Sequence, residues 1–149
     1  MKVVDAEMLA FSQGVTRRGS YAAYLDISHP EIEEFLDVRK PTGGDINRKS
    51  TNLHHGVVIS DDFMTVIENA TKIEGYDDSW NLIDPHSGTI VKTVSAKTLW
   101  VKLIQNRVET GEPYIMFGDT VDEATPEFQK KLGLKVHQSN LCSEITLPT

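Results

Sequence analysis

The chain has 149 residues, of which 39% are hydrophobic and 25% charged, and its formal net charge is −7 at pH 7. This length is typical of one domain, and the composition is ordinary for a soluble globular protein. The acidic balance excludes a general nucleic-acid binder, which needs a basic face, although one local basic loop could hold the phosphates of a mononucleotide. The single cysteine, Cys142, cannot form an internal disulfide, which favours a reducing compartment.

The N-terminal sequence and the apolar runs bear on the cellular compartment. Asp5 and Glu7 interrupt the N-terminus, so it does not resemble a signal peptide. No apolar run in the sequence approaches the length of a membrane-spanning helix. We therefore expect a cytoplasmic protein with no membrane partner.

Residues 1–11 are predicted to form a helix, because the apolar residues Val4, Met8 and Phe11 follow a helical spacing. No capping residue precedes this pattern. The helix is therefore expected to be the last part of an element whose beginning is missing.

Two glycines frame a short polar loop at residues 12–20. Gly14 and Gly19 let the backbone turn tightly and approach a ligand closely. Arg17 and Arg18 supply planar, permanently charged donors that suit phosphate groups or base edges. The loop is therefore either a nucleotide-contacting loop or a solvated turn between a helix and a strand.

Strands and helices alternate along the rest of the chain. Apolar runs bounded by turn residues predict strands at residues 21–27, 53–59 and 113–117. Helical apolar spacing predicts helices at residues 29–38, 60–70 and 95–109, and a polar stretch predicts a short helix and turn at residues 119–132. A turn signature predicts a hairpin between strands at residues 80–83 and 89–94. This alternation predicts an α/β fold with parallel strand pairing.

The helix boundaries are marked by residues that favour the ends of helices. Pro30 stands at the favoured first position of the helix at residues 29–38. Ser60 and Ser95 can cap the next two helices, and Gly111 is expected to end the longest helix as a C-cap.

His54 and His55 are neighbours on a predicted strand, so their side chains should point to opposite faces. They cannot easily bind one metal ion together, and no spacing of cysteine and histidine in the sequence indicates a metal site. We therefore expect no metal centre here, and we expect His86, at the tip of the predicted hairpin, to be a surface residue.

The segment at residues 139–145 contains the lone cysteine. If this segment is extended, Asn140, Cys142 and Glu144 share one face. A helix would bring Asn140 and Glu144 together but turn Cys142 away. An extended segment therefore presents a thiol, an amide and a proton acceptor to one substrate. The alternative is a buried cysteine on an ordinary strand, because free cysteine packs as a small hydrophobe.

The same segment, Ser-Asn-Leu-Cys-Ser-Glu-Ile followed by Thr-Leu-Pro-Thr, resembles the finger-loop motif of the large (catalytic, alpha) subunit of class I ribonucleotide reductase. Residues 13–20 resemble the specificity loop of that family. Residues 24–36 resemble the strand and helix that follow the loop, and residues 110–115 resemble the segment upstream of the finger loop. Several motifs in the right order cover nearly the whole chain, which makes the resemblance specific.

The resemblance implies that residues 1–149 are one part of a ten-stranded α/β barrel, with the cysteine loop threaded inside and no separate second domain. Cys142 matches the residue that becomes a thiyl radical and abstracts the 3′ hydrogen of a ribonucleotide. Glu144 matches the carboxylate that takes the 3′-hydroxyl proton, and Asn140 matches the amide that hydrogen-bonds the ribose hydroxyls. The implied activity is reduction of ribonucleotides, as diphosphates, to deoxyribonucleotides for DNA synthesis.

The resemblance also implies ligands and partners. Gln13 and Arg17 match specificity-loop positions that relay a bound dNTP or ATP effector to the substrate base, and Gly14, Arg18 and Gly19 belong to the same loop. No cofactor is expected to bind the chain directly, because a metal-containing small subunit supplies the radical in this family. Thioredoxin or glutaredoxin is the implied reductant.

The chain also departs from the family pattern. The large subunit is several times longer and needs two further cysteines as a reducing dithiol, a C-terminal cysteine pair and tyrosines on the radical path, none of which can be assigned here. We therefore expect a fragment, from a truncated gene or a split subunit, that is inactive alone. Because an open barrel leaves strand edges unpaired, we expect the chain to associate with the remaining part of the large subunit or to aggregate.

Two other hypotheses compete with this one. A thiol hydrolase could use Cys142 with His137 or another histidine to generate the thiolate. A non-catalytic nucleotide-binding or assembly module could use the loop at residues 13–20.

Overall fold

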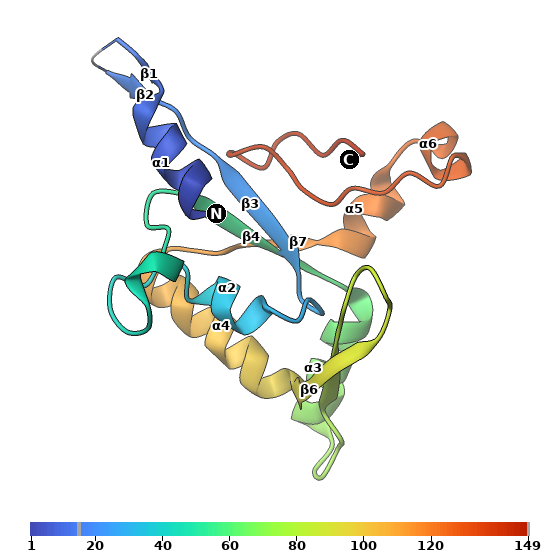
Figure 1. Ribbon diagram of the computed structural model, residues 1–149. Helices are drawn as coiled ribbons and strands as arrows, with labels where there is room; N and C mark the ends of the chain where they lie inside the picture. Colours follow the sequence, from blue (N-terminus) through green and yellow to red (C-terminus); the bar gives the residue numbers. More distant parts are fainter. Residues whose placement is uncertain (15, 149) are drawn as a thin grey trace.

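The computed structural model of the chain describes residues 1–14 and 16–148 (Figure 1). Its centre is a parallel sheet in the order β3 (Ala22–Asp26), β4 (His54–Ile59) and β7 (Tyr114–Phe117). The predicted α/β class, the three strands and their parallel pairing are confirmed. The sheet is open rather than a closed barrel, which fits one part of a barrel.

Helices α2 (Ile32–Leu36), α3 (Asp61–Lys72) and α4 (Ala96–Thr110) follow the strands. Figure 1 shows α2 and α4 on one side of the sheet, with the C-terminal segment on the other side. Two helix starts are capped by serine hydroxyls, because Ser60 accepts a hydrogen bond from the N–H of Phe63 and Ser95 accepts one from the N–H of Thr98. The predicted caps at both serines are confirmed.

The C-cap of α4 is Gly111, which has a φ of 79° in the left-handed region. Glycine adopts this conformation without the steric cost that a Cβ atom brings. The predicted C-cap is therefore confirmed.

One apolar core lies between the sheet and these helices. Alternate strand residues such as Val57 and Ile59 meet the buried faces of the helices, and the ring of Phe63 packs edge-on against Trp80 with centroids 5.0 Å apart. The other buried members come from the turn after β3, all three helices and the hairpin: Ile27, Ile32, Phe35, Leu36, Ile67, Leu82, Ala96, Leu99 and Leu103. Burial of these side chains is the main force that holds the helices on the sheet.

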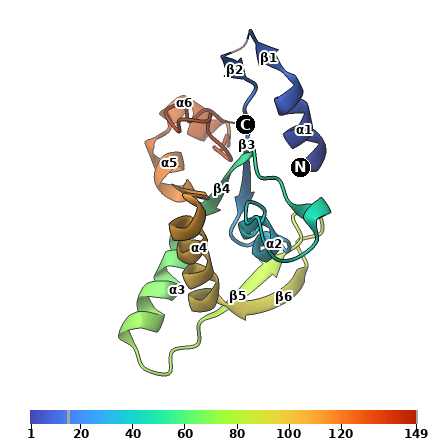
Figure 2. The same ribbon diagram turned by 90° about the vertical axis from the view of Figure 1, so that its left-hand side faces the viewer.

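The predicted hairpin forms between β5 (Ser79–Ile83) and β6 (Ile90–Ser95), and only Leu82 of this hairpin is fully buried. A second, smaller hairpin joins β1 (Ser12–Gln13) and β2 (Arg17–Arg18) after α1 (Lys2–Ala10). The two hairpins lie at opposite ends of the molecule in both Figure 1 and Figure 2.

The helix predicted at residues 29–38 is shorter than expected, since α2 covers only Ile32–Leu36. Residues 29–31 lie in the turn region after β3, so the prediction of Pro30 as the first helical residue is wrong. The carboxylate of Asp26 accepts a hydrogen bond from the N–H of Ser28 at 2.7 Å, and its carbonyl accepts one from the N–H of His29 at 3.0 Å. These local bonds compete with helical ones and delay the start of the helix.

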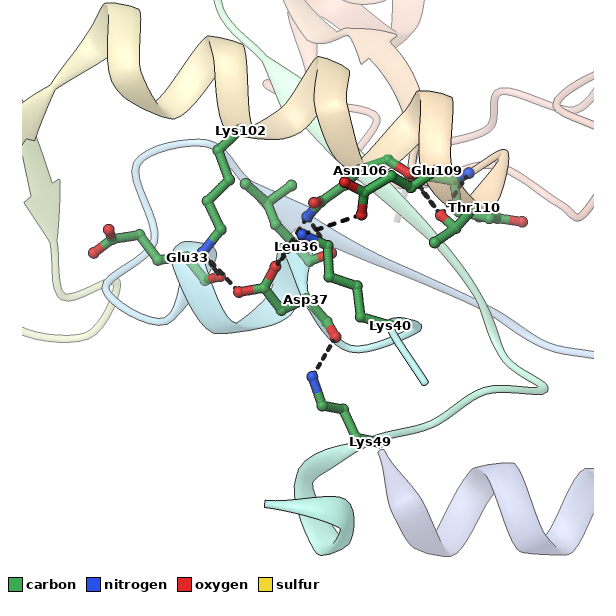
Figure 3. A network of polar contacts seen from close by, with 10 residues as sticks. Glu33, Leu36, Asp37, Lys40, Lys49, Lys102, Asn106, Glu109 and Thr110 are labelled. Carbon is green, nitrogen blue, oxygen red and sulfur yellow. Dashed lines mark hydrogen bonds and ion pairs between the residues drawn. The ribbon is translucent and has the colours of Figure 1, made fainter. Parts of the chain in front are cut away.

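A polar network fixes the C-terminal end of α2 to α4 (Figure 3). The Lys102 ammonium contacts the Asp37 carboxylate at 2.8 Å and donates to the carbonyl of Glu33 at 2.7 Å. The amide of Asn106, which is 1% exposed, donates to the carbonyl of Leu36 at 2.8 Å. The network therefore satisfies carbonyls that the short helix leaves without intrahelical partners.

After β7 the chain forms α5 (Gly118–Ala124) and α6 (Glu127–Lys131), with a 3₁₀ turn, η1 (Ile46–Arg48), earlier in the fold. From residue 134 to residue 148 the chain has no helix or strand. Within the residues that the structure describes, no helix is both long enough and apolar enough to cross a membrane.

Candidate functional site

Cys142 lies in a tight turn near the C-terminal end. The N–H of Ser143 donates to the carbonyl of Asn140 at 3.0 Å, and Ser143 has a left-handed φ of 61°. The side-chain oxygen of Asn140 accepts a hydrogen bond from the N–H of Ile145 at 3.0 Å, and the hydroxyl of Ser139 donates to the carbonyl of Ile145 at 2.9 Å. These bonds close a loop over residues 139–145, which we call the Cys142 loop.

The prediction of an extended segment is therefore wrong. Asn140, Cys142 and Glu144 do not alternate along a strand, because the side chains of Asn140 and Ser139 bond to the backbone inside the segment. Such local bonds replace the ladder of a sheet. The loop still gathers the three residues within one turn, and it leaves Cys142 and Glu144 exposed. The alternative of a buried strand cysteine is also wrong.

The Cys142 loop lies against the sheet face that points away from the helices. The loop and the sheet both line a cavity of about 240 Å³, to which the C-terminal segment contributes Ser139, Ser143 and Thr146 and the sheet contributes Tyr24 and Tyr114. The side of the sheet that α2 and α4 leave uncovered is therefore the side on which the C-terminal segment lies (Figure 1).

The predicted specificity loop is the β1–β2 hairpin, in which Gln13 pairs with Arg17 and Ser12 with Arg18. Both arginine side chains are exposed. The turn glycine Gly14 has a φ of 66°, which glycine adopts without the steric cost of a Cβ atom. Figure 1 shows this hairpin projecting at the end of α1, whereas the C-terminal segment lies beside β3.

Gly19, which follows β2, packs closely against α1. A Cβ atom at Gly19 would lie 2.9 Å from the carbonyl oxygen of Met8, which is too close for any other residue at this point. The glycine thus allows close packing of the hairpin on α1. Contact between this hairpin and a nucleotide stays a prediction from the sequence.

A buried carboxylate lies just before β7, and no individual role was predicted for it. Glu112 is 6% exposed, and its Oε1 lies 2.5 Å from Nδ1 of His54. Its Oε2 accepts a hydrogen bond from the N–H of His55 at 3.1 Å. The only sequence signal was its place between Gly111 and Pro113, so the pairing could not be found without the fold.

His55 is fully buried and packs edge-on against Phe35, with ring centroids 5.2 Å apart. Burial lowers the pKa of His55 to about 4, although the Glu112 carboxylate opposes this shift. His54 instead lies on the other face and stacks on Tyr114. The opposite orientation of the two histidines is confirmed, and no cluster of three metal-binding side chains occurs among the described residues.

Comparison with known proteins gives one consistent result. Residues 1–149 match the family model described as ribonucleotide reductase, barrel domain. The chain is 50% identical over 149 residues to the putative ribonucleoside-diphosphate reductase large subunit of Frog virus 3 (isolate Goorha), covering 100% of this chain and 25% of the relative. It is also 50% identical over 142 residues to the large subunit of Invertebrate iridescent virus 6, covering 95% of this chain and 15% of the relative.

A solved structure agrees with these sequence relatives. The class Id ribonucleotide reductase alpha subunit of Actinobacillus ureae superposes with a TM-score of 0.72 at 30% identity, covering 99% of this chain and 22% of that one. The chain thus spans a quarter or less of the length of these three relatives. By the match of its full length to the family model, the chain belongs to the ribonucleotide reductase barrel-domain family.

Proposed function

We propose that this chain is the part of a ribonucleotide reductase large subunit that carries the radical cysteine, and that the assembled enzyme reduces ribonucleoside diphosphates to deoxyribonucleotides. The observation that carries the proposal is the match of residues 1–149 to the reductase barrel domain, together with an exposed Cys142 in a closed loop. The relatives named as ribonucleoside-diphosphate reductases support the diphosphate as substrate.

In this proposal three residues of the Cys142 loop act on one ribose. Cys142, as a thiyl radical, takes the 3′ hydrogen atom of the substrate and becomes a thiol. Glu144 accepts the 3′-hydroxyl proton as a general base. The side-chain N–H₂ of Asn140 donates to the ribose hydroxyls, because its oxygen already accepts the bond from Ile145. Holding these groups in one short loop supplies the positioning that such chemistry needs.

The reduction consumes two electrons, and this chain has one cysteine. We propose that a cysteine pair in the remaining part of the large subunit is oxidised to a disulfide, and that thioredoxin or glutaredoxin reduces it again. A metal-containing small subunit supplies the radical. We propose all of these partners for the assembled enzyme. We also propose that residues 1–149 form a single domain.

The β1–β2 hairpin is proposed to be the specificity loop of the reductase. Arg17 and Arg18 are exposed and can reach a phosphate or a base edge, and Gln13 lies opposite Arg17 in the hairpin. Gly14 and Gly19 give the hairpin its turn and its close packing on α1. A dNTP or ATP effector would bind at this end of the molecule.

The competing hypotheses gain nothing from the comparisons. A thiol hydrolase with Cys142 and His137, or a non-catalytic nucleotide-binding module, does not account for relatives that are named as reductase large subunits. The reductase is therefore the function that we propose.

The test is turnover of an assembled reductase. The chain is combined with the remaining large-subunit segments and a small subunit, and the conversion of a ribonucleoside diphosphate is measured for wild type, Cys142→Ser and the neighbouring control Ser143→Ala. We expect loss of turnover in Cys142→Ser alone. Full turnover in Cys142→Ser would falsify the proposal.

A further inference from the structure

The surface beneath the Cys142 loop is built from one row of residues across the sheet. Tyr24 of β3 lies opposite Gly56 of β4, and Gly56 lies opposite Tyr114 of β7. The strand neighbours Ala23, Leu25 and Val57 belong to or pack against the core on the helix side. Because side chains alternate between the faces of a strand, the two tyrosines face the other side, where the loop lies.

Gly56 has no side chain, and the ring of Tyr24 occupies the space above it. A Cβ atom at Gly56 would lie 2.4 Å from Cε1 and 2.6 Å from Cδ1 of Tyr24. No other residue fits there unless the ring moves. Tyr24 therefore lies over its neighbouring strand, and its hydroxyl oxygen is buried.

Tyr114 completes the row, and its ring contacts His54 of β4. His54 stacks on the Tyr114 ring at a centroid distance of 6.1 Å, and Glu112 fixes His54 at 2.5 Å. Burial raises the pKa of Tyr114, and the charges of Glu112, Tyr24 and Cys142 raise it further. Cys142 is thus close enough to Tyr114 for an electrostatic interaction.

Both tyrosines also line the 240 Å³ cavity together with Ser139, Ser143 and Thr146 of the C-terminal segment. We propose that Tyr24 and Tyr114 are positioning residues for the Cys142 loop: their rings, in one row with Gly56, form the floor on which the loop rests. The floor sets the height of Cys142 above the sheet and limits the motion of the loop. The relevance of this height to catalysis rests on the proposed reductase function, whereas the floor itself does not.

Because the chain has a single cysteine, the motion of the Cys142 loop can be measured with one specific label. A nitroxide spin label on Cys142 of the full 149-residue chain reports the motion of the loop by electron paramagnetic resonance. We expect Tyr24→Ala and Tyr114→Ala to shorten the rotational correlation time of the label by about twofold or more, because each removes a ring that limits the loop. Tyr24→Phe, which keeps the ring, and Tyr76→Ala, which changes an exposed tyrosine in the loop after α3, should leave the spectrum unchanged.

Gly56 gives an independent test by a double-mutant cycle. Gly56→Ala should alter the label spectrum in the wild-type background, because the added methyl group displaces the Tyr24 ring. The same substitution should have no further effect in a Tyr24→Ala background, where that ring is absent.

Circular dichroism shows which variants keep the native fold, and Tyr24→Leu and Tyr114→Leu replace any alanine variant that unfolds. Unchanged label motion in folded variants of both tyrosines would contradict the proposal that Tyr24 and Tyr114 position the Cys142 loop. A failure of the proposed function gives a different result, namely label spectra that respond as expected while Cys142→Ser retains full turnover in the assembled reductase.

Discussion

The side-chain oxygen of Asn140 accepts a hydrogen bond from the backbone N–H of Ile145 at 3.0 Å, and this bond closes the loop that presents Cys142. The residue whose amide is proposed to bind the ribose therefore also shapes the loop. One carboxamide can do both, because its oxygen accepts and its nitrogen donates.

Asn140→Ala should loosen this loop, whereas Asn140→Asp should keep it closed, because aspartate retains the accepting oxygen. The lost bond is worth about 1 kcal/mol, which corresponds to about fivefold faster hydrogen exchange at the Ile145 amide. Exchange measured by NMR checks this. Equal exchange rates for the alanine and aspartate variants would show that the bond does not hold the loop.

In the assembled reductase the same pair separates the two roles of Asn140. Asn140→Asp keeps the loop but loses the donor to the ribose, so turnover should fall although the Ile145 amide stays protected. Turnover equal to wild type in Asn140→Asp would contradict the substrate role and leave the loop-closing role intact.

Glu112→Ala should destabilise the fold by about 2–3 kcal/mol, because it leaves His54 and the buried N–H of His55 without their acceptor. Urea unfolding measures this free energy. Glu109→Ala is the matched control, since Glu109 forms an exposed pair with Lys40, and the expected change is below about 1 kcal/mol. Equal stabilities of the two variants would contradict a structural role for Glu112.

Stability should fall on acidification because His55 is buried in its neutral form. Its pKa is lowered from 6.5 to about 4 in the folded chain, so the unfolded chain binds a proton that the folded chain does not. The free energy of unfolding is therefore unaffected by His55 above the unfolded pKa, decreases as the pH falls from about 6.5 towards about 4, and levels off below that.

Urea midpoints measured across this pH range test the effect. Replacement of His55 by leucine should remove part of the slope, whereas His86→Gln at the exposed hairpin tip should leave the slope as it is. An identical slope in wild type and His55→Leu would mean that another group causes the acid sensitivity.

Asn106→Leu should cost about 1–3 kcal/mol of stability, because the carbonyl of Leu36 then loses a buried donor (Figure 3). The neighbouring exposed residue supplies the control, and Gln105→Ala should change the free energy of unfolding by less than about 0.5 kcal/mol. Thermal unfolding of the two variants compares them directly, and similar melting temperatures would show that α2 does not depend on this network.

Features that depend on local sequence could be predicted. Ser60, Ser95 and Gly111 mark helix ends through bonds and backbone conformations within a few residues, and the apolar runs mark the strands. The Cys142 loop was predicted wrongly because its shape depends on side-chain bonds of Ser139 and Asn140, which a period-two pattern does not reveal.

Features that depend on strand register could not be predicted. The need for glycine at position 56 follows from Tyr24 on the neighbouring strand, and only the strand register places the two residues opposite each other. Glu112 contacts His54 although the two residues are 58 positions apart in the sequence. The identity of the Cys142 motif was accessible from the sequence through its resemblance to the reductase family. The surroundings of the loop required the fold.

The most direct test of the central claim is the fate of the substrate 3′ hydrogen. Turnover of a 3′-deuterated ribonucleoside diphosphate by the assembled reductase should be slower than that of the unlabelled substrate, and Cys142→Ser should abolish cleavage of the 3′ C–H bond. Cleavage of that bond at the wild-type rate in Cys142→Ser would show that Cys142 is not the hydrogen-abstracting residue.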